Sequence, residues 1–596
     1  MQKARQIIKL AFKNIIVYRI DYIHVFALFR LFQFLFIVPV TSLAFKFMLR
    51  VTGYTHITDQ NLYSFLMHPF VICMMLLWIL IVLLFIYYEM GFLFVMAFNQ
   101  QRGTRYRFLA IWQQLNRKAV YFFSFQTIYL AIYIALLLPL ASFILPFTLT
   151  QEITIPHFIM DELMQTKTGR LFYAGVASML VIFGVRSILT LPIFTIHPKL
   201  SIRQSLMQSW RFSKRRLFKL LVLLAMLLTG HLLLLLGITV ISTLPLYYLE
   251  RHWPSTALVT AGVTLAFLEI VFVVLFSLLQ AMFSQVMVAI TYNTLRLSKQ
   301  KIAPNLLKKR YKQIFLLGGI VFGVMSVINI DSLEKSIYAP DTKIIAHRGY
   351  NEVGVENTIS GLVNAANLGA DLIELDIQQT ADGEFVVFHD RTLRRLAGKN
   401  NTVANMTLSE LTAVTIHANG FSDKITSLDD FIEMAKALDV ALLIELKIHG
   451  KETEDILLRL VEKLRVHKVL DTYYVQSSNT EMITQLKNIT PNLRVGIVYA
   501  LNIGLIDDTK VDFIALEESS VSDRLIEELQ QQDIDLFVWT LNNDRSLQEF
   551  IGKNVGGIIT DHPTVALEIR SQQSEHEYFL QRVLNRLHFI FLKISW

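Results

Sequence analysis

The chain of 596 residues has a single cysteine, Cys73, so no disulfide can form within it. It also lacks a Gly-rich nucleotide-binding fingerprint. Its N-terminus, MQKARQIIKLAFKNII, is basic and amphipathic and has no small-residue cleavage site. These absences argue against a disulfide scaffold, a dinucleotide-binding domain and a cleaved signal peptide. The N-terminal pattern instead predicts an interfacial helix.

Acidic residues are scarce in the first part of the chain. Between Asp341 and Arg570 there are roughly 21 Lys and Arg against roughly 36 Asp and Glu, whereas the whole chain has 56 against 48. The surplus behind the net charge of +8 therefore lies before residue 331, in short loops between apolar runs. This distribution is typical of membrane topology, and it argues against a nucleic-acid partner.

Long apolar runs dominate residues 1–335, and we interpret this part as an all-α polytopic membrane domain. A spanning helix needs about 20 mostly apolar residues. Seven spans are predicted, at about 24–47, 70–96, 120–146, 171–195, 217–247, 257–291 and 314–330. Two arginines, Arg30 and Arg186, fall inside spans but near enough to an interface to snorkel. The spans contain no obvious buried acid pair.

The loops between these spans alternate in charge. The second, fourth and sixth loops are rich in Lys and Arg, whereas the first, third and fifth hold only one or two basic residues each. The positive-inside rule places the even loops and the N-terminus in the cytoplasm. Seven crossings then leave the C-terminal domain outside the cell membrane. If the short last span did not cross, that domain would be cytoplasmic, but the basic run Lys308–Lys312 just before it favours a crossing.

Past Tyr338 the pattern changes to short β-rich runs separated by amphipathic helical segments, which is typical of βα units. Eight strands are predicted over residues 340–570, and this number favours an α/β TIM barrel over a doubly wound sheet. They are 344–347, 372–378, 442–446, 473–477, 494–498, 512–516, 536–540 and 556–560. Residues 571–596 form a further amphipathic tail, which could lie on the membrane.

Polar side chains gather at the predicted strand ends, where barrel enzymes carry their catalytic groups. After the second strand, the turn Thr380–Gly383 leads directly into FVVFHD, so a small hairpin insertion carries His389 over the barrel mouth. Strand alternation puts Glu374 and Asp376 on one face. The other residues at strand ends are His347, Glu445, Lys447 and Trp539.

Three carboxylates in one polar mouth repel each other unless a cation neutralises them. Oxygen-only ligation by Glu374, Asp376 and Glu445 favours Mg²⁺ or Ca²⁺ over zinc. Such a site suits cleavage of a phosphodiester, whose transition-state charge Arg348 and Lys447 could stabilise. Two histidines can provide the proton donor and the proton acceptor, so we hypothesise that His347 and His389 form an acid–base pair. Glu445 and Lys447 could alternatively form only a salt bridge.

Residues 343–566 resemble the glycerophosphodiester phosphodiesterases, and the apolar half resembles the multi-span domain of some bacterial members. The resemblance is carried by AHRGYNEVGVENT, GADLIELDIQQTADGEFVVFHD, LLIELK, FVWTLNN and GGIITDHP. It implies a TIM barrel with a small insertion, hydrolysis to sn-glycerol 3-phosphate and an alcohol, and a divalent cation. The implied residues are His347 and His389 for catalysis, Glu374, Asp376 and Glu445 for the metal, Arg348 and Lys447 for phosphate, Glu356 in support, and Trp539 as a pocket wall.

Two stretches depart from the pattern of this family. Ser478 stands where the family usually has an aromatic residue, which leaves the shape of the alcohol pocket open. The stretch RTLRRLAGKNNT after Asp390 is more basic than usual, which hints at an anionic or polymeric substrate. Trp539 could also serve only in packing.

Several functions and substrates remain open at this point. The substrate could be a deacylated phospholipid, a lysolipid or a glycerophosphate polymer of a cell envelope. The membrane half could instead be the functional module, as a transporter or scaffold, with the barrel sensing or binding for it. A barrel that binds without cleaving is disfavoured, because the expected acid–base and metal residues are all present. The oligomeric state is not indicated by the sequence.

Overall fold

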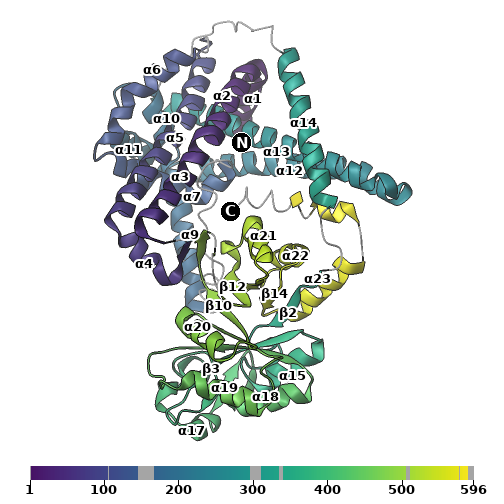
Figure 1. The fold of residues 1–596 in the computed structure, drawn as a ribbon. Coiled ribbons are helices and arrows are strands. Elements are labelled where there is room, and N and C mark those ends of the chain that lie inside the picture. The colour runs from purple at the N-terminus through teal and green to yellow at the C-terminus, as the bar shows by residue number, and fades with distance from the viewer. Residues whose placement is uncertain are drawn as a thin grey trace.

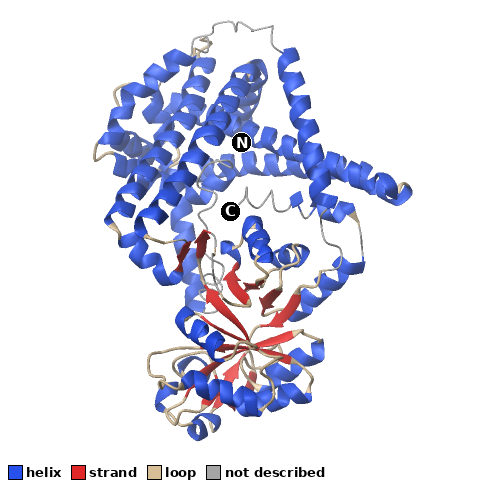
Figure 2. Ribbon diagram, viewed as in Figure 1, coloured by secondary structure: helices blue, strands red, loops and turns tan. Residues whose placement is uncertain are grey.

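The computed structural model describes residues 2–54, 56–104, 107–144, 167–295, 311–334, 340–504, 506, 510–575, 578–584 and 586–587. A helical part and a barrel follow each other along the chain, as Figure 1 shows, and the strands are confined almost entirely to the second part (Figure 2). The fold class predicted from the sequence, a membrane domain of helices followed by an α/β barrel, is confirmed.

The helical part is built from long apolar helices with short connecting elements. Within the part of the chain that the structure describes, six stretches are long and apolar enough to cross a membrane. They are Arg19–Thr52, Pro69–Gln101, Lys167–Ile196, Leu217–His252, Pro254–Thr291 and Leu316–Glu334. The remaining predicted span, 120–146, begins at a bend: helices Phe108–Phe123 and Thr127–Ala135 meet at 98°, and together they could make a seventh crossing. Part of that predicted span lies outside the described residues.

The individual elements of this part alternate between long helices and short turns. In chain order they are α1 (Gln2–Val17), α2 (Arg19–Phe32), η1 (Gln33–Ile37), α3 (Val38–Thr52), β1 (His56–Thr58), α4 (Asp59–Met67), α5 (Pro69–Gln101), α6 (Phe108–Ala119), η2 (Val120–Phe123), α7 (Thr127–Ile144), α9 (Lys167–Ser187), α10 (Thr190–Ile196), α11 (Ile202–Ser213), α12 (Leu217–His252), η3 (Pro254–Thr256), α13 (Ala257–Leu295) and α14 (Tyr311–Glu334). Close packing of α13 on α14 requires Gly262, because a Cβ there would lie 2.4 Å from Ile330 Cγ1.

Arg30 corrects one interpretation made from the sequence. Its guanidinium does not reach out to an interface but lies 2.6 Å from a carboxylate oxygen of Glu89, which is 1% exposed. Arg30 also donates to Gln33 on the next element. The apolar helices therefore do hold a buried acid, and it is neutralised by a residue of another helix. Such pairing is the usual solution for an ionised group inside a membrane domain.

The second part closes into a barrel of eight parallel strands. Its strand order is β2-β14-β13-β12-β10-β9-β8-β3, and pairing of β2 with β3 completes the ring. The strands are β2 (Lys343–Ala346), β3 (Leu372–Gln379), β8 (Ala441–Leu446), β9 (Tyr474–Ser477), β10 (Arg494–Tyr499), β12 (Phe513–Glu517), β13 (Asp535–Trp539) and β14 (Gly557–Thr560). Each lies within one or two residues of its predicted position, because short apolar runs bounded by polar residues define them clearly.

Helices surround the barrel, and the predicted hairpin is present. The helices are α15 (Ile359–Leu368), α18 (Leu428–Ala437), α19 (Ile456–Val466), α20 (Thr480–Ile489), α21 (Asp523–Gln531), α22 (Asp544–Gly552) and α23 (Pro563–Glu575). The insertion after β3 contains β4 (Phe385–Val387), α16 (Arg394–Ala397), η4 (Val403–Asn405), α17 (Leu408–Thr412), β5 (Thr415–Ala418), β6 (Phe421–Lys424) and β7 (Thr426–Ser427). Strand β4 pairs antiparallel with β3 and so returns the chain toward the mouth.

Among the described residues, the barrel meets the helical part in two regions. On one side, β1 pairs antiparallel with β11 (Asn502–Gly504), a short strand in the loop after β10. On the other side, the described part of the C-terminal tail packs on α12 and α14. Its Val583 and Leu587 are buried, and Arg582 donates to the carbonyl of Leu333 at 2.9 Å. This part of the tail therefore packs against protein helices, and residues 588–596 lie outside the described residues.

Candidate functional site

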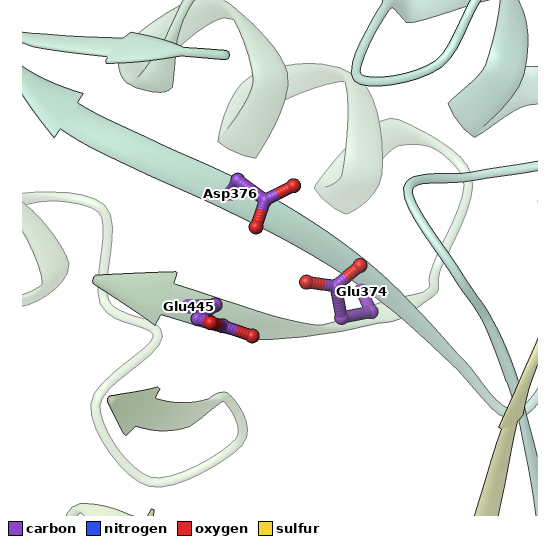
Figure 3. A group of neighbouring side chains, drawn as sticks. All are labelled: Glu374, Asp376 and Glu445. Carbon is purple, nitrogen blue, oxygen red and sulfur yellow. The ribbon is translucent and has the colours of Figure 1, made fainter. Parts of the chain in front are cut away.

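Three carboxylates from neighbouring strands converge at the barrel mouth. Glu374 and Asp376 lie on β3 and Glu445 on β8, and the register of these parallel strands sets Asp376 directly opposite Glu445. Figure 3 shows the three side chains turned toward one another. One oxygen from each lies within 4.8 Å of the others, and both β3 carboxylates are 1% exposed. The three oxygens form the kind of donor set that Mg²⁺ and Ca²⁺ prefer.

The charges around this cluster are not fully balanced. Lys447 places its ammonium 3.1 Å from Asp376 and also contacts Glu445. Burial by itself raises the pKa of Asp376, but the charges of Lys447 and Arg348 outweigh it and hold that pKa well below its usual range. Burial, and then the negative charge of Asp376, raise the pKa of Glu374 well above its usual range. The site therefore still favours an additional positive charge, and its residues fit a divalent cation.

Arg348 connects the carboxylate cluster to the loop that follows β2. Its backbone N–H donates to Glu374 at 2.8 Å, and its guanidinium lies 3.2 Å from Asp376. The same guanidinium donates to Glu356 at 3.0 Å. Arg348 has φ +56°, and the next residue, Gly349, also has positive φ and lies so close to α15 that a Cβ would come within 2.7 Å of the backbone of Gly361. A constrained turn thus fixes the orientation of Arg348.

Glu356 is part of a chain of charges that reaches the second histidine. Arg395, on α16 of the insertion, contacts Glu356 at 2.6 Å and Asp390 at 2.8 Å. Asp390 in turn lies 2.9 Å from Nδ1 of His389. Burial alone raises the pKa of Asp390, but its bonds to His389 and Arg395 outweigh burial and hold that pKa low. Asp390 therefore stays ionised and orients the imidazole of His389.

His347 has an equivalent partner that the sequence reasoning did not assign. Its Nδ1 lies 2.8 Å from Asp561, the residue that follows β14. Asp561 is held by Asn351 at 2.9 Å and by Asn542 at 2.6 Å. Burial alone lowers the pKa of His347, but the charge and the hydrogen bond of Asp561, together with the charge of Glu374, outweigh burial, so the pKa stands above its ordinary value. The rule that strand ends carry functional groups would have indicated Asp561, since it ends the eighth strand.

Two more inward-facing residues were also missed. Gln476 on β9 donates from Nε2 to Glu445 at 3.0 Å, so it positions the third carboxylate. Glu517 ends β12 as a fully buried carboxylate and accepts a hydrogen bond from the backbone N–H of Ser519 at 2.8 Å. Trp539 ends β13 and is half-buried against the inner core of the barrel. The structure thus brings the carboxylates, Arg348, Lys447 and Glu356 into direct contact, and it places Trp539 on another strand of the same mouth.

Comparisons with known proteins agree with this arrangement. Residues 8–331 match the membrane domain of glycerophosphoryl diester phosphodiesterase, and residues 347–565 match the glycerophosphoryl diester phosphodiesterase family. The two matches define a phosphoric diester hydrolase joined to a membrane domain. The chain belongs to the glycerophosphodiester phosphodiesterase family.

Individual relatives match about two fifths of this chain. A glycerophosphodiester phosphodiesterase of Caldanaerobacter subterraneus is 28% identical over 238 residues, which are 38% of this chain and 97% of the relative. One from Bacillus altitudinis is 24% identical over 39% of this chain and 99% of its own length. Among solved structures, a phosphodiesterase from Oleispira antarctica in complex with the product sn-glycerol-3-phosphate is 20% identical, with a TM-score of 0.36, over 38% of this chain and 96% of that chain.

The carboxylate cluster leads to a prediction on metal binding that does not depend on activity. Adding Mg²⁺ or Ca²⁺ to chelator-treated protein should raise its Tm, because an ion that binds only the folded state stabilises it by mass action, by about 2.7 kcal/mol at a hundred times Kd. Glu445→Gln should remove most of this rise. Glu433→Gln, a control carboxylate that is 59% exposed on α18, should retain it. Equal rises in the wild type and Glu445→Gln would contradict a metal site here.

Proposed function

We propose that the chain hydrolyses glycerophosphodiesters to sn-glycerol 3-phosphate and an alcohol, by metal-dependent two-histidine acid–base catalysis at the membrane surface. The observation that carries this proposal is the cluster of three carboxylates, two of them buried, beside Arg348 and Lys447. Membership of the phosphodiesterase family supports the reaction type. The two histidines, each backed by a carboxylate, support the acid–base assignment.

Glu374, Asp376 and Glu445 are the residues that would hold Mg²⁺ or Ca²⁺. The ion would neutralise the phosphodiester and make its phosphorus more open to attack. Arg348 and Lys447 lie against the same carboxylates, so they would contact the remaining phosphoryl oxygens. Glu356 keeps Arg348 in place, and Trp539 would form a wall of the substrate pocket.

His347 and His389 would carry the protons. In both residues Nδ1 is bound to a carboxylate, so Nε2 is the atom left to exchange a proton with the substrate. One imidazole accepts the proton of the attacking hydroxyl or water as its oxygen bonds to phosphorus. The other gives a proton to the alkoxide as the bond between phosphorus and the alcohol oxygen breaks. The first imidazole then loses its proton to solvent and the second takes one up from solvent, which restores both to their starting states.

The proposed division of the chain follows the same argument. Residues 1–335 would form the multi-span membrane domain, 340–570 the catalytic barrel, and 571–596 an amphipathic tail. The tail would hold the barrel to the membrane domain, since Glu250 on α12 accepts hydrogen bonds from the backbone N–H groups of Phe579 and Leu580.

We also propose that the barrel lies outside the cell membrane. Figure 1 shows α6 at the end of the helical part away from the barrel and α11 between α6 and α4, whereas α4 lies at the end beside the barrel. The basic second and fourth loops contain or adjoin α6 and α11, and the weakly charged first loop contains α4. The positive-inside rule assigns the basic end to the cytoplasm, so the separation of the two ends supports an extracytoplasmic catalytic domain.

The reaction is tested by measuring glycerol 3-phosphate release from glycerophosphocholine, glycerophosphoethanolamine and glycerophosphoglycerol by the full chain in nanodiscs. Activity should require a divalent cation. His347→Ala and His389→Ala should each lower kcat by about 10²–10⁴-fold, the usual contribution of general acid–base catalysis. His417→Ala, at an exposed histidine of the β5–β6 hairpin, should change nothing. Metal-independent release, or full activity in either histidine variant, would overturn the mechanism.

The pairing of His347 with Asp561 predicts a pH effect of known sign. The Asp561 charge favours protonated His347, so Asp561→Asn should lower the pKa of His347. If His347 is the acid, the alkaline limb of the kcat/KM profile should move to lower pH. If it is the base, the acidic limb should move to lower pH. Asp429→Asn, which removes the carboxylate beside the distant His467, should leave both limbs in place. A limb that moves to higher pH in Asp561→Asn would contradict this pairing.

Orientation can be tested by cysteine labelling in a Cys73→Ser background. Ser571→Cys on α23 should react with an impermeant maleimide in intact cells, because α23 belongs to the barrel. Lys214→Cys, in the basic loop between α11 and α12, should react only after lysis. The reverse pattern would place the barrel in the cytoplasm.

A further inference from the structure

The first loop of the membrane domain contributes to the rim of the barrel mouth. Its strand β1 pairs antiparallel with β11, with Ile57 opposite Ile503. Figure 2 shows this two-stranded ribbon between the helices and the barrel. Because β11 follows the C-terminal end of β10, the ribbon lies on the face of the barrel where the strands end in functional groups.

Helix α4, which follows β1 directly, contacts a second loop of the same rim. Gln60 donates from Nε2 to the backbone carbonyl of Ser478, and its Oε1 accepts a hydrogen bond from Thr480 Oγ1 at 3.3 Å. Ser478 follows β9, only two residues after Gln476, whose amide holds Glu445. The contact therefore lies beside a residue that positions the carboxylate cluster.

The exposed face of α4 carries two large apolar side chains, Tyr63 and Met67, that do not pack into the core. Gln60, Tyr63 and Met67 are three and four residues apart and so lie along one side of the helix. Tyr63 is 73% exposed and Met67 is 56% exposed, whereas Phe65 on the opposite side is 4% exposed in a cluster with Ile57. The packing that holds α4 in place is therefore provided by the opposite face, which contains Phe65.

This exposed face runs from the mouth to the start of a membrane span. Gln60 contacts the rim, and Met67 is followed two residues later by Pro69, the first residue of α5. The segment 56–67, HITDQNLYSFLM, contains no lysine or arginine. The segment therefore offers a polyanionic chain no cationic side chain with which to pair. An apolar chain could pack against the ring of Tyr63 and the side chain of Met67.

We propose that the α4 strip, defined as Gln60, Tyr63 and Met67, binds the apolar chain of a monoacyl glycerophosphodiester whose head group occupies the barrel mouth. This assignment rests on the proposed function, and it makes the membrane domain a determinant of substrate specificity. The lipid would stay partly in the bilayer beside α5 while its phosphodiester reaches the carboxylates. Water then adds to phosphorus and the head-group alcohol leaves, as for a soluble substrate.

The test compares a soluble and a lipid substrate on the full chain in nanodiscs, with glycerophosphocholine and lysophosphatidylcholine as the two probes. The measured quantity is the ratio of kcat/KM for lysophosphatidylcholine to that for glycerophosphocholine. In the double variant Tyr63→Ser, Met67→Ser this ratio should fall roughly ten-fold, because apolar contact with the acyl chain is lost. Phe218→Ser, at a 77% exposed residue of α12, is the matched control and should keep the wild-type ratio.

The outcomes separate this inference from the proposed function. An unchanged ratio in the double variant, or an equal loss on both substrates, overturns the lipid-binding role of the strip. Turnover of glycerophosphocholine without any turnover of lysophosphatidylcholine by the wild type also overturns it, while the phosphodiesterase activity stands. If neither substrate is turned over with metal present, both the lipid-binding role of the strip and the proposed phosphodiesterase function are overturned.

A cross-link checks the contact on which the strip depends. In a Cys73→Ser background, Ile57→Cys and Ile503→Cys should form a disulfide on mild oxidation, because directly opposed residues of an antiparallel pair lie within disulfide range. Ile57→Cys with Val466→Cys, on the exposed surface of α19, should not. Failure of the first pair to cross-link would remove α4 from the rim and with it the proposed role.

Discussion

The repulsion among three clustered carboxylates, two of them buried, determines much of the chemistry at the barrel mouth. Parallel pairing of β3 with β8 forces Asp376 and Glu445 to lie opposite each other, and strand alternation adds Glu374 on the same face. Buried like charges are costly without compensation. Lys447 and Arg348 compensate two of the three, and the raised pKa of Glu374 shows that the balance is incomplete. The backbone register therefore creates the carboxylate cluster that we propose to bind a dication.

A second set of charged residues holds in position the side chains that contact the carboxylate cluster. Glu356 holds Arg348 on one side and Arg395 on the other, and Arg395 extends the chain to Asp390 and His389. Because these residues come from the β2–α15 loop and from the insertion after β3, the insertion cannot move without disturbing Arg348. His347 depends likewise on Asp561, which two asparagines anchor. His347 is thus oriented by a residue 214 positions away, whereas His389 is oriented by the adjacent Asp390, which Arg395 links to Glu356.

Local patterns in the sequence predicted the elements well but not their long-range partners. The eight strands and the apolar helices follow from runs and periodicity, which depend only on neighbouring residues. In the same way, the placement of Glu374 and Asp376 on one face of their strand follows from the alternation of side chains along a strand. The pairing of His347 with Asp561 joins residues 214 positions apart, and Arg30 meets Glu89 across two helices. No local pattern encodes such partners. The bend between η2 and α7 was missed because the apolar run continues through it.

The membrane domain holds the barrel at two places, and this arrangement limits how substrates can approach. The β1–β11 ribbon and Gln60 contact the rim near β9 and β10, while the tail contacts α12 and α14 near the point where the chain leaves the membrane domain. A barrel on a single flexible linker would sample many orientations. Two attachments keep the mouth beside α4, so a substrate anchored in the bilayer would be presented at a high effective concentration. A substrate that arrives from solution gains no such advantage. It can enter the mouth whether the barrel is attached at two places or by a single linker.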